Sequence, residues 1–373
     1  MARLGLGGRW TCVFANEWCP KKAQTYINNF GVGASKTCTE LKVDDVANLT
    51  AEQLPGTAAL AWGSFPCQDL SLAGNGAGLK GRRSGTFKPF WRLIEDLRAQ
   101  NRAPRLVVLE NVVGTLTSHA GKDFPYIVQR LAECNYRVGA IVVDAARFLP
   151  QSRPRLFVIG FHSADALPAG LSDVNAHGIW HTKSVVQAFE KLPDELKAAW
   201  VWWSLPVPSA PVPILGSLIE EEPSGVEWNS DEQTQRIIDL MSPVHFAKLE
   251  KAMRLRKRIV GTIYKRTRPN ETGLRKQCAE VRFDQVSGCL RTPVGGSSRQ
   301  VIIVVEGARV RSRLLSPGEA ARLMGVPSTY SLPQKYNEAY HLLGDGVVVP
   351  VVSWLERNLL YPLAASCGIP KAA

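Results

Sequence analysis

Residues 58–68 read AALAWGSFPCQ, a continuous apolar run that ends in a proline, a cysteine and a glutamine. Residues 106–112 repeat the pattern as LVVLENV, in which the apolar run ends in a carboxylate and an amide. Apolar runs of this length between chain-breaking residues are typical of strands buried on both faces of a sheet. Polar residues that follow such strands lie at the sheet edge where ligands bind. The two stretches therefore predict neighbouring strands with reactive groups at one edge.

Further strands and helices surround these two stretches. Besides Ala58–Trp62 and Leu106–Leu109, the predicted strands are Trp10–Ala15, Ile141–Asp144 and Leu156–Phe161. Helical stretches are predicted at Cys19–Phe30, Trp91–Gln100 and Phe124–Cys134. Strands that alternate with helices are typical of an α/β fold with a mostly parallel sheet and crossover helices.

The composition is that of an ordinary folded protein with an excess of positive charge. The chain has 373 residues, of which 45% are hydrophobic and 21% charged, and its formal net charge is +12. It contains no apolar run long enough to span a bilayer and no pattern of a secretory signal, so a cytoplasmic protein without membrane contact is predicted. Its eight cysteines show no zinc-ligand spacing, so reduced thiols and no metal are expected.

The positive charge is concentrated in one segment, which we call the basic block (residues 251–276). It holds ten lysines and arginines against the single acid Glu271. A solvated basic helix followed by a loop would explain it, but such a block is also an electrostatic footprint for nucleic acid.

The sequence pattern changes after residue 163, which indicates a domain boundary there. The proline-rich stretch Leu205–Gly216 reads as an extended connector, and an acidic patch (Glu220–Glu222) precedes the basic block. We predict a first domain over residues 1–163, a smaller, irregular domain over 164–295 and a return to the first domain over 296–373.

Four parts of the sequence carry candidate chemistry. Cys67 follows a predicted strand, where nearby positive charge can turn its thiol into a nucleophile. The following glycine-rich basic segment, Ser71–Phe87, is typical of a lid that closes on a phosphate backbone. Glu110 lies at the mouth of an apolar strand and can share a proton with a ring nitrogen. In QSRPR (residues 151–155), strand alternation is expected to point Gln151, Arg153 and Arg155 to one side.

Taken in order, five motifs resemble those of the DNA cytosine-5 methyltransferases. They are GSFPCQDLS, ENV, QSRPRLFVIG, RLLSPGEAARLMGVP (Arg313–Pro327) and GDGVVVPVVSWL (Gly344–Leu355). The resemblance covers nearly the whole chain and implies a Rossmann-like catalytic domain with a separate target-recognition domain, which we expect at 164–295. It also implies transfer of a methyl group from S-adenosylmethionine to cytosine in double-stranded DNA.

The resemblance implies a role for each catalytic candidate. Cys67 would add to carbon 6 of the cytosine, and Glu110 would bind the N3 and amine edge of the ring. Arg155 would hydrogen-bond the carbonyl oxygen, and Arg153 would support the site near the thiolate. The target base must be flipped out of the duplex, because its reactive atoms are unreachable in the stack.

The same resemblance implies cofactor contacts at five positions. Glu17 would bind the ribose hydroxyls, Trp18 would lie against the adenine, and Asp45 would contact the adenine amine. Phe87 and Asp345 match the remaining contacts.

Candidate DNA contacts come from the predicted lid, the basic block and the segment after it. They are Ser71, Lys80, Arg82, Arg83, Arg256, Lys257, Arg258, Arg266, Arg268 and Arg291. Within this set we expect Arg256, Lys257 and Arg258 to contact phosphates, and base readers to lie nearer Arg266, Arg268 or Arg291. The expected setting is the bacterial cytosol and nucleoid, as a monomer, with a cognate restriction endonuclease acting separately.

One departure from the family leaves alternatives open. The family begins with a strand ending in Phe-x-Gly-x-Gly, whereas this sequence starts where that motif should just have finished. A start codon assigned too late and a truncated chain would both explain this. A catalytically silent DNA-binding relative is therefore one alternative, which upstream codons encoding the motif would exclude. A cysteine enzyme acting on free pyrimidine nucleotides is another, although the basic block would be needless for it.

Overall fold

The chain divides into two compact units, each of which we describe by itself. The computed structural model describes residues 1–65, 86–269, 273–292 and 299–368. The β3–β6 unit comprises Leu6–Asp144, Pro154–Val207 and Val352–Ala373, and the β9–β12 unit comprises Met1–Gly5, Ala145–Arg153 and Pro208–Val351. The domain boundaries expected from the sequence, at 163 and 295, stay a prediction.

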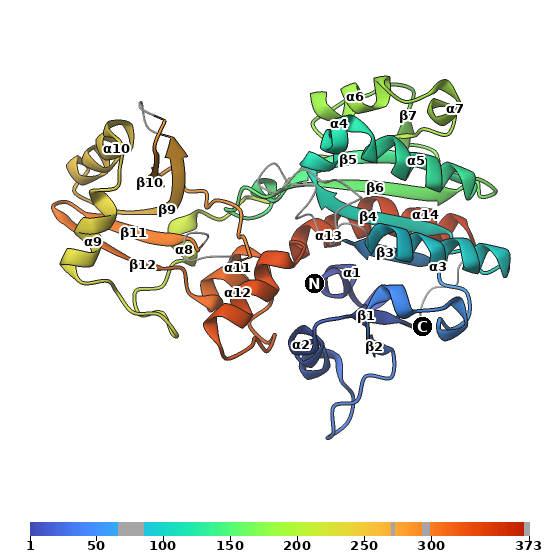
Figure 1. Cartoon of the computed structure of the whole chain (residues 1–373), viewed down its shortest axis with the longest axis horizontal. Helices are drawn as coiled ribbons and strands as arrows, with labels where there is room; N and C mark the ends of the chain where they lie inside the picture. Colours follow the sequence, from blue (N-terminus) through green and yellow to red (C-terminus); the bar gives the residue numbers. More distant parts are fainter. Residues whose placement is uncertain (66–85, 270–272, 293–298, 369–373) are drawn as a thin grey trace. The chain divides into compact units, whose positions relative to one another are not determined.

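A mixed four-stranded sheet lies at the centre of the β3–β6 unit (Figure 1). Its strands are β3 (Leu60–Ser64), β4 (Leu106–Val112), β5 (Tyr136–Asp144) and β6 (Pro154–His162), in the order β3-β4-β6-β5. Strands β3 and β4 are parallel, whereas β6 runs antiparallel to both β4 and β5. The predicted α/β class is confirmed, and the sheet contains more antiparallel pairing than we expected.

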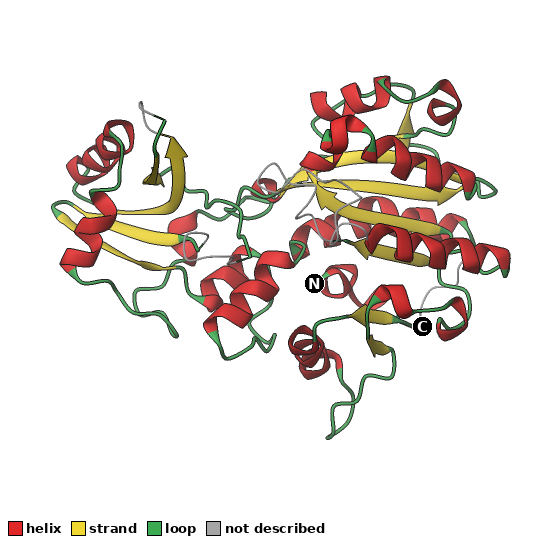
Figure 2. Ribbon diagram, viewed as in Figure 1, coloured by secondary structure: helices red, strands yellow, loops and turns green. Residues whose placement is uncertain are grey.

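Helices cover this sheet because their apolar residues recur at helical spacing. Helices α3 (Phe87–Ala99) and α5 (Asp123–Glu133) place Trp91, Ile94, Ile127 and Leu131 in one core with residues of β4, β5 and β6. The strand residues Leu106–Leu109 are at most 2% exposed, as expected of a strand covered on both faces. Figure 2 shows the helices and strands that make up this unit.

Shorter elements complete the β3–β6 unit. Its other helices are α2 (Pro20–Phe30), α4 (Ser118–Gly121), α6 (Lys183–Glu190), α7 (Asp194–Lys197) and α14 (Tyr361–Ser366), and α13 (Val349–Leu355) crosses the boundary between the units. Strands β1 (Ala15–Glu17) and β2 (Leu41–Val43) form a separate parallel pair, and β7 (Ser172–Asp173) pairs with β8 (Trp202–Trp203).

The β9–β12 unit contains an antiparallel sheet in the order β10-β9-β11-β12. Its strands are β9 (Arg258–Pro269), β10 (Arg275–Arg282), β11 (Val301–Glu306) and β12 (Arg309–Leu314). Helix α10 (Pro243–Arg254) packs Leu249 and Ala252 onto one face of this sheet, against Ile263, Val281 and Ile303. The remaining helices are α1 (Ala2–Leu6), which ends at the boundary, α8 (Leu215–Leu218), α9 (Asp231–Ile238), α11 (Pro317–Leu323) and α12 (Tyr336–Asp345).

The first predicted strand is wrong, and the others shift by a few residues. The apolar run Trp10–Ala15 has no strand before its last residue, where β1 begins. The strand predicted over Leu156–Phe161 is β6, which begins at Pro154. Gln151 and Arg153 therefore precede this strand, and the side-chain alternation predicted for them does not apply. Among the described residues, no helix is long and apolar enough to cross a membrane.

Candidate active site

The ends of three strands meet at one edge of the β3–β6 sheet. Ser64, the last residue of β3, pairs with Glu110 in the parallel strand β4. Val112, the last residue of β4, pairs with Arg155 near the start of the antiparallel strand β6. Strand pairing therefore brings Glu110 and Arg155 to the edge at which β3 ends.

Glu110 and Arg155 form a largely buried ion pair at this edge. The Nε atom of Arg155 lies 3.2 Å from Oε1 of Glu110, and their side chains are 15% and 8% exposed. A buried carboxylate is stable only when it is paired, and removal of one partner is costly. Together the two groups offer a hydrogen-bond acceptor and a fork of donors, which suits recognition of a polar ring edge.

Asn111 anchors the chain that leads to Cys67, a role that our sequence reasoning missed. Its Nδ2 atom donates a hydrogen bond to the carbonyl oxygen of Phe65 over 3.1 Å, and the residue is 5% exposed. Its Oδ1 atom accepts from the backbone N–H of Val112. The amide thus fixes the backbone two residues before Cys67. The signal was present in ENV, where a buried polar residue needs a partner.

Several predicted residues lie outside the described part of the chain. They are Cys67 and the predicted lid residues Ser71, Lys80, Arg82 and Arg83. Their roles stay predictions.

Arg153 belongs to the β9–β12 unit and contacts backbone carbonyl groups there. The residue is 2% exposed. Its Nη1 atom donates to the carbonyl oxygen of Leu290, and its Nη2 atom donates to those of Gly344 and Gly346. Its partners therefore differ from the carboxylate that Arg155 contacts.

Trp18, one of the predicted cofactor contacts, is largely exposed. It follows β1 and is 71% exposed, which is unusual for a tryptophan. The neighbouring carboxylate of Glu17 accepts the backbone N–H of Cys19. The carboxylate of Asp45 accepts the N–H of Ala47 and so caps the short helix Val46–Asn48.

A second residue that we missed, Arg92, holds the segment after Asp45. From α3, its Nη2 atom donates to the carbonyl oxygens of Ala47 and Leu49 over 3.2 and 2.7 Å. The sequence shows only that Arg92 lies on an amphipathic helix, which does not predict this contact with a distant segment.

The two remaining predicted cofactor residues have different surroundings. Phe87 is fully buried and stacks on Trp91, so its ring packs in the core. In the β9–β12 unit, Asp345 is the last residue of α12, and its Oδ1 atom accepts a 2.6 Å hydrogen bond from Thr292.

Two of the predicted DNA contacts in the β9–β12 unit are paired with carboxylates. Arg258 lies 2.6 Å from a carboxylate oxygen of Glu221, and Arg266 lies 3.1 Å from Glu280. Burial alone would raise the pKa of Glu221, but Arg258 and Arg311 outweigh this effect and lower it. Arg256, Lys257 and Arg291 are exposed, and the side chain of Arg268 lies outside the described part.

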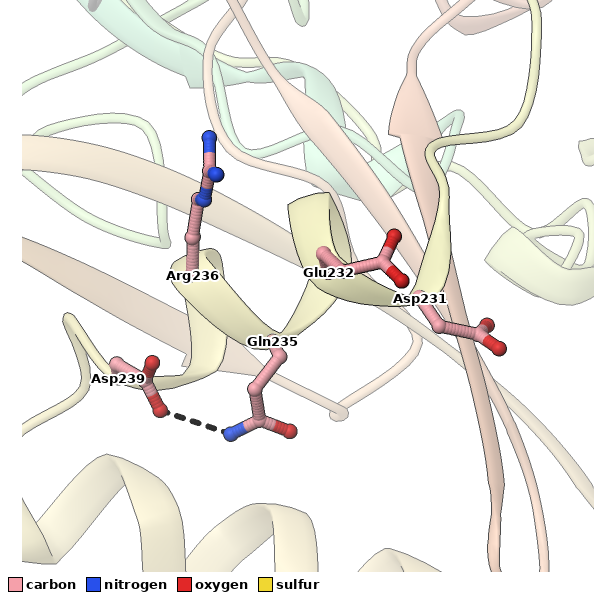
Figure 3. Close-up of a pocket in the computed structure, with 5 residues that line it drawn as sticks. All are labelled: Asp231, Glu232, Gln235, Arg236 and Asp239. Atoms are coloured by element: carbon pink, nitrogen blue, oxygen red, sulfur yellow. Dashed lines mark hydrogen bonds between the residues drawn. The ribbon is translucent and has the colours of Figure 1, made fainter.

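Other features of the described residues do not point to a site. A hollow on α9 is lined by Asp231, Glu232, Gln235, Arg236 and Asp239, and Gln235 donates to Asp239 (Figure 3). Its three carboxylates have the wrong charge for binding a phosphate. No group of three or more metal-ligating side chains lies together in the described ranges.

Comparisons with solved structures support the α/β fold of the chain. The Dnmt2 methyltransferase of S. pombe matches with a TM-score of 0.56 and 18% identity, over 95% of this chain and 91% of that chain. A putative DNA modification methyltransferase from an E. coli prophage matches with a TM-score of 0.52 and 17% identity, over 98% and 95%. At these identities the likeness shows the fold.

The sequence comparisons show the family. The model for C-5 cytosine-specific DNA methylase matches residues 2–360, and the chain therefore belongs to that family and is a DNA cytosine-5 methyltransferase. The family takes its methyl group from S-adenosylmethionine. Type II methyltransferase M.DsaV of Dactylococcopsis salina is 28% identical over 95% of this chain and 80% of its own length. Type II methyltransferase M.NgoBI of Neisseria gonorrhoeae is 26% identical over 94% and 87%.

Proposed function

We propose that the chain methylates carbon 5 of a cytosine that is flipped out of a specific double-stranded DNA sequence, through a covalent adduct of Cys67 at carbon 6. The observation that carries this proposal is the buried Glu110–Arg155 pair, 3.2 Å apart at the sheet edge where β3 ends. Phe65, held there by Asn111, lies two residues before Cys67.

The proposed chemistry starts with the thiolate of Cys67, because carbon 5 of cytosine is a weak nucleophile. A bond from sulfur to carbon 6 pushes electron density onto carbon 5. Glu110 holds a proton at N3 and accepts from the exocyclic amine, and Arg155 donates to the ring carbonyl oxygen. After methylation a base removes the proton from carbon 5. The carbon–sulfur bond then breaks, which restores the ring and the thiolate.

The residues present fit S-adenosylmethionine, which supplies the electrophilic methyl group when it is bound. The 71% exposed ring of Trp18 suits an adenine face, and the adjacent carboxylate of Glu17 suits ribose hydroxyls. Asp45 and Asp345 offer further acceptors for the cofactor. The ring of Phe87 is fully buried, so we assign it a supporting role in the core rather than a direct contact with the cofactor.

Flipping the base costs a few kcal/mol, which contacts to DNA phosphates can offset. We assign phosphate contacts to the exposed Arg256 and Lys257, and to the predicted lid residues Ser71, Lys80, Arg82 and Arg83. Reading of bases is assigned to the region of Arg266, Arg268 and Arg291, within a target-recognition domain at 164–295.

The relatives named Type II methyltransferases support a place in a restriction-modification system. We propose a cytoplasmic, nucleoid-associated monomer whose cognate restriction endonuclease acts separately on the same DNA sequence.

Bisulfite sequencing of DNA from cells that express the chain tests this function. Protected cytosines should fall at one position of one recurring sequence, and cells expressing Cys67→Ser should show none. A protein that binds DNA without producing any protected cytosine would instead be the catalytically silent relative. Protection that persists with Cys67→Ser would refute the covalent mechanism.

A further inference from the structure

The guanidinium of Arg153 caps the C-terminal end of α12. The last carbonyl groups of a helix have no partner within it, and a cation near them is favourable. Arg153 donates to the carbonyl oxygen of Gly344, in the last turn, and to that of Gly346, just past it, over 2.7 and 2.8 Å. These two residues flank Asp345.

The same guanidinium holds a second segment beside α12. Its Nη1 atom donates to the carbonyl oxygen of Leu290 over 2.7 Å, and two residues later Thr292 donates to the carboxylate of Asp345. The segments approach so closely that a Cβ atom at Gly344 would lie 2.9 Å from the backbone carbon of Arg291. Arg153 and Thr292 together therefore fix both the backbone and the carboxylate of Asp345.

The position of Asp345 is electrostatically unfavourable in itself. A carboxylate at a helix C-terminus faces the negative end of the helix dipole. Arg153, buried to 2% exposure, and Thr292 both compensate for this cost. A carboxylate held against such a cost is typical of a functional group rather than of a surface residue.

We infer that Arg153 and Thr292 are positioning residues that pre-organise Asp345 for S-adenosylmethionine. The inference rests on the proposed function, in which Asp345 contacts the cofactor. Because Arg153 and Thr292 hold residues 344–346 in place, cofactor binding does not include the free-energy cost of ordering these residues. Loss of either residue should therefore weaken cofactor binding more than it slows the chemical step.

Thr292→Val tests the inference with a substitution of similar volume. Calorimetric titration with S-adenosylhomocysteine should show an affinity about tenfold lower, the usual effect of losing a hydrogen bond to a charged group. The KM for S-adenosylmethionine should rise by a similar factor, with kcat within about twofold of wild type. Thr57→Val, at an exposed threonine of the other unit, is the matched control and should change neither.

An Asp345→Asn background shows whether Thr292 acts through Asp345. Thr292→Val should have little further effect on binding of S-adenosylhomocysteine there, because residues that act as one unit are not additive. Full additivity of the two substitutions would overturn the inference.

Arg153→Lys separates the two roles that Arg153 could have. Lysine keeps the positive charge but lacks the forked guanidinium that reaches several carbonyl groups. The backbone amide of Gly346 should therefore exchange hydrogen faster in the ligand-free protein. S-adenosylhomocysteine should also bind more weakly. Unchanged binding and exchange, with slower covalent trapping on 5-fluorocytosine DNA, would assign Arg153 to the thiolate and overturn the inference. If the wild type itself does not bind S-adenosylhomocysteine, the proposed function fails and this inference fails with it.

Discussion

In the β3–β6 sheet the charged pair Glu110–Arg155 lies at one edge of otherwise apolar strands, whereas in the β9–β12 sheet three arginines lie on one face of the single strand β12. Leu106–Leu109 in β4 are almost fully buried up to Glu110. In β12, by contrast, Arg309, Arg311 and Arg313 alternate with residues of the opposite face, and strand pairing puts Arg258 on the same face.

The arginines of that face are largely bound to carboxylates of their own unit. Arg313 and Glu319 are both fully buried and 2.7 Å apart, and Glu221 lies within 3.3 Å of both Arg258 and Arg311. The number of cations in a sequence therefore overestimates the positive charge that is available to bind DNA. A single charged pair among apolar strands indicates a functional site better than the number of cations does.

The largest expected effect concerns the isolated pair. Glu110→Gln keeps the shape of the side chain but loses the carboxylate that we propose stabilises the attacked ring, so the rate of methyl transfer should fall by about 10²–10⁴. Single-turnover assays with tritiated cofactor measure this rate, and DNA affinity should change little. The exposed Glu222→Gln is the control. Normal turnover with weakened DNA binding would make Glu110 a structural residue.

The next effect concerns the buried pair of the other sheet. Arg313→Met should lower the free energy of unfolding of the β9–β12 unit by about 3–5 kcal/mol, because it leaves Glu319 buried without its guanidinium. Urea unfolding followed by tryptophan fluorescence measures the loss. Adding Glu319→Leu should restore much of the stability, and a double variant no more stable than Arg313→Met would contradict this account.

Asn111→Leu should slow methylation by roughly tenfold through loss of the hydrogen bond to Phe65. The rate of adduct formation on 5-fluorocytosine DNA should fall by the same factor, since the substitution acts on the placement of Cys67. Asn28→Leu, on an exposed face of α2, serves as the control. Slower methylation with an unchanged trapping rate would place Asn111 elsewhere in the reaction.

A smaller effect separates exposed from paired cations of the basic block. Replacing Arg256 and Lys257 by alanine should make the slope of log affinity against log salt shallower by about 0.9 for each phosphate that is no longer neutralised. Arg258→Ala should change the slope less, because Glu221 already neutralises Arg258. The methylated sequence should stay the same when Arg256, Lys257 and Arg258 are all replaced by alanine. Equal changes of slope for Arg256→Ala, Lys257→Ala and Arg258→Ala would contradict the distinction between exposed and paired cations.

The smallest effect is a pH dependence of the paired face. The pKa of Glu221 is lower in the folded chain than its usual value of 4.5, so its contribution to stability is present above pH 4.5 and is lost as the pH falls below it. Thermal unfolding between pH 6 and about pH 3 should therefore show a smaller loss of stability for Glu221→Gln than for the wild type. Parallel curves would show that the face does not depend on this carboxylate.

The local sequence pattern predicted much of the β3–β6 unit, because its buried strands can be recognised in the sequence as continuous apolar runs. Glu110 and Arg155 could be expected at one site because their motifs adjoin such strands. The antiparallel direction of β6 could not be predicted, because pairing depends on contacts between distant residues.

The contacts that sequence reasoning missed all join residues far apart in the chain. Asn111 to Phe65, Arg92 to Leu49 and Arg153 to Gly344 are bonds from a side chain to a distant backbone carbonyl. Every residue has a backbone carbonyl group, so the sequence does not show which of them accepts such a hydrogen bond. The pairing of Arg258 with Glu221 was hidden for a related reason, because the acidic patch and the basic block looked like separate segments.

Covalent trapping on a duplex that carries 5-fluorocytosine in the methylated sequence tests whether Cys67 adds to the target cytosine. Fluorine at carbon 5 cannot leave as a proton does, so the adduct between Cys67 and carbon 6 should persist on a denaturing gel. The wild type should give a cofactor-dependent band, and Cys67→Ser should give none. A wild type that methylates ordinary DNA but forms no such band, or a band that survives Cys67→Ser, would contradict the addition of Cys67 to the cytosine.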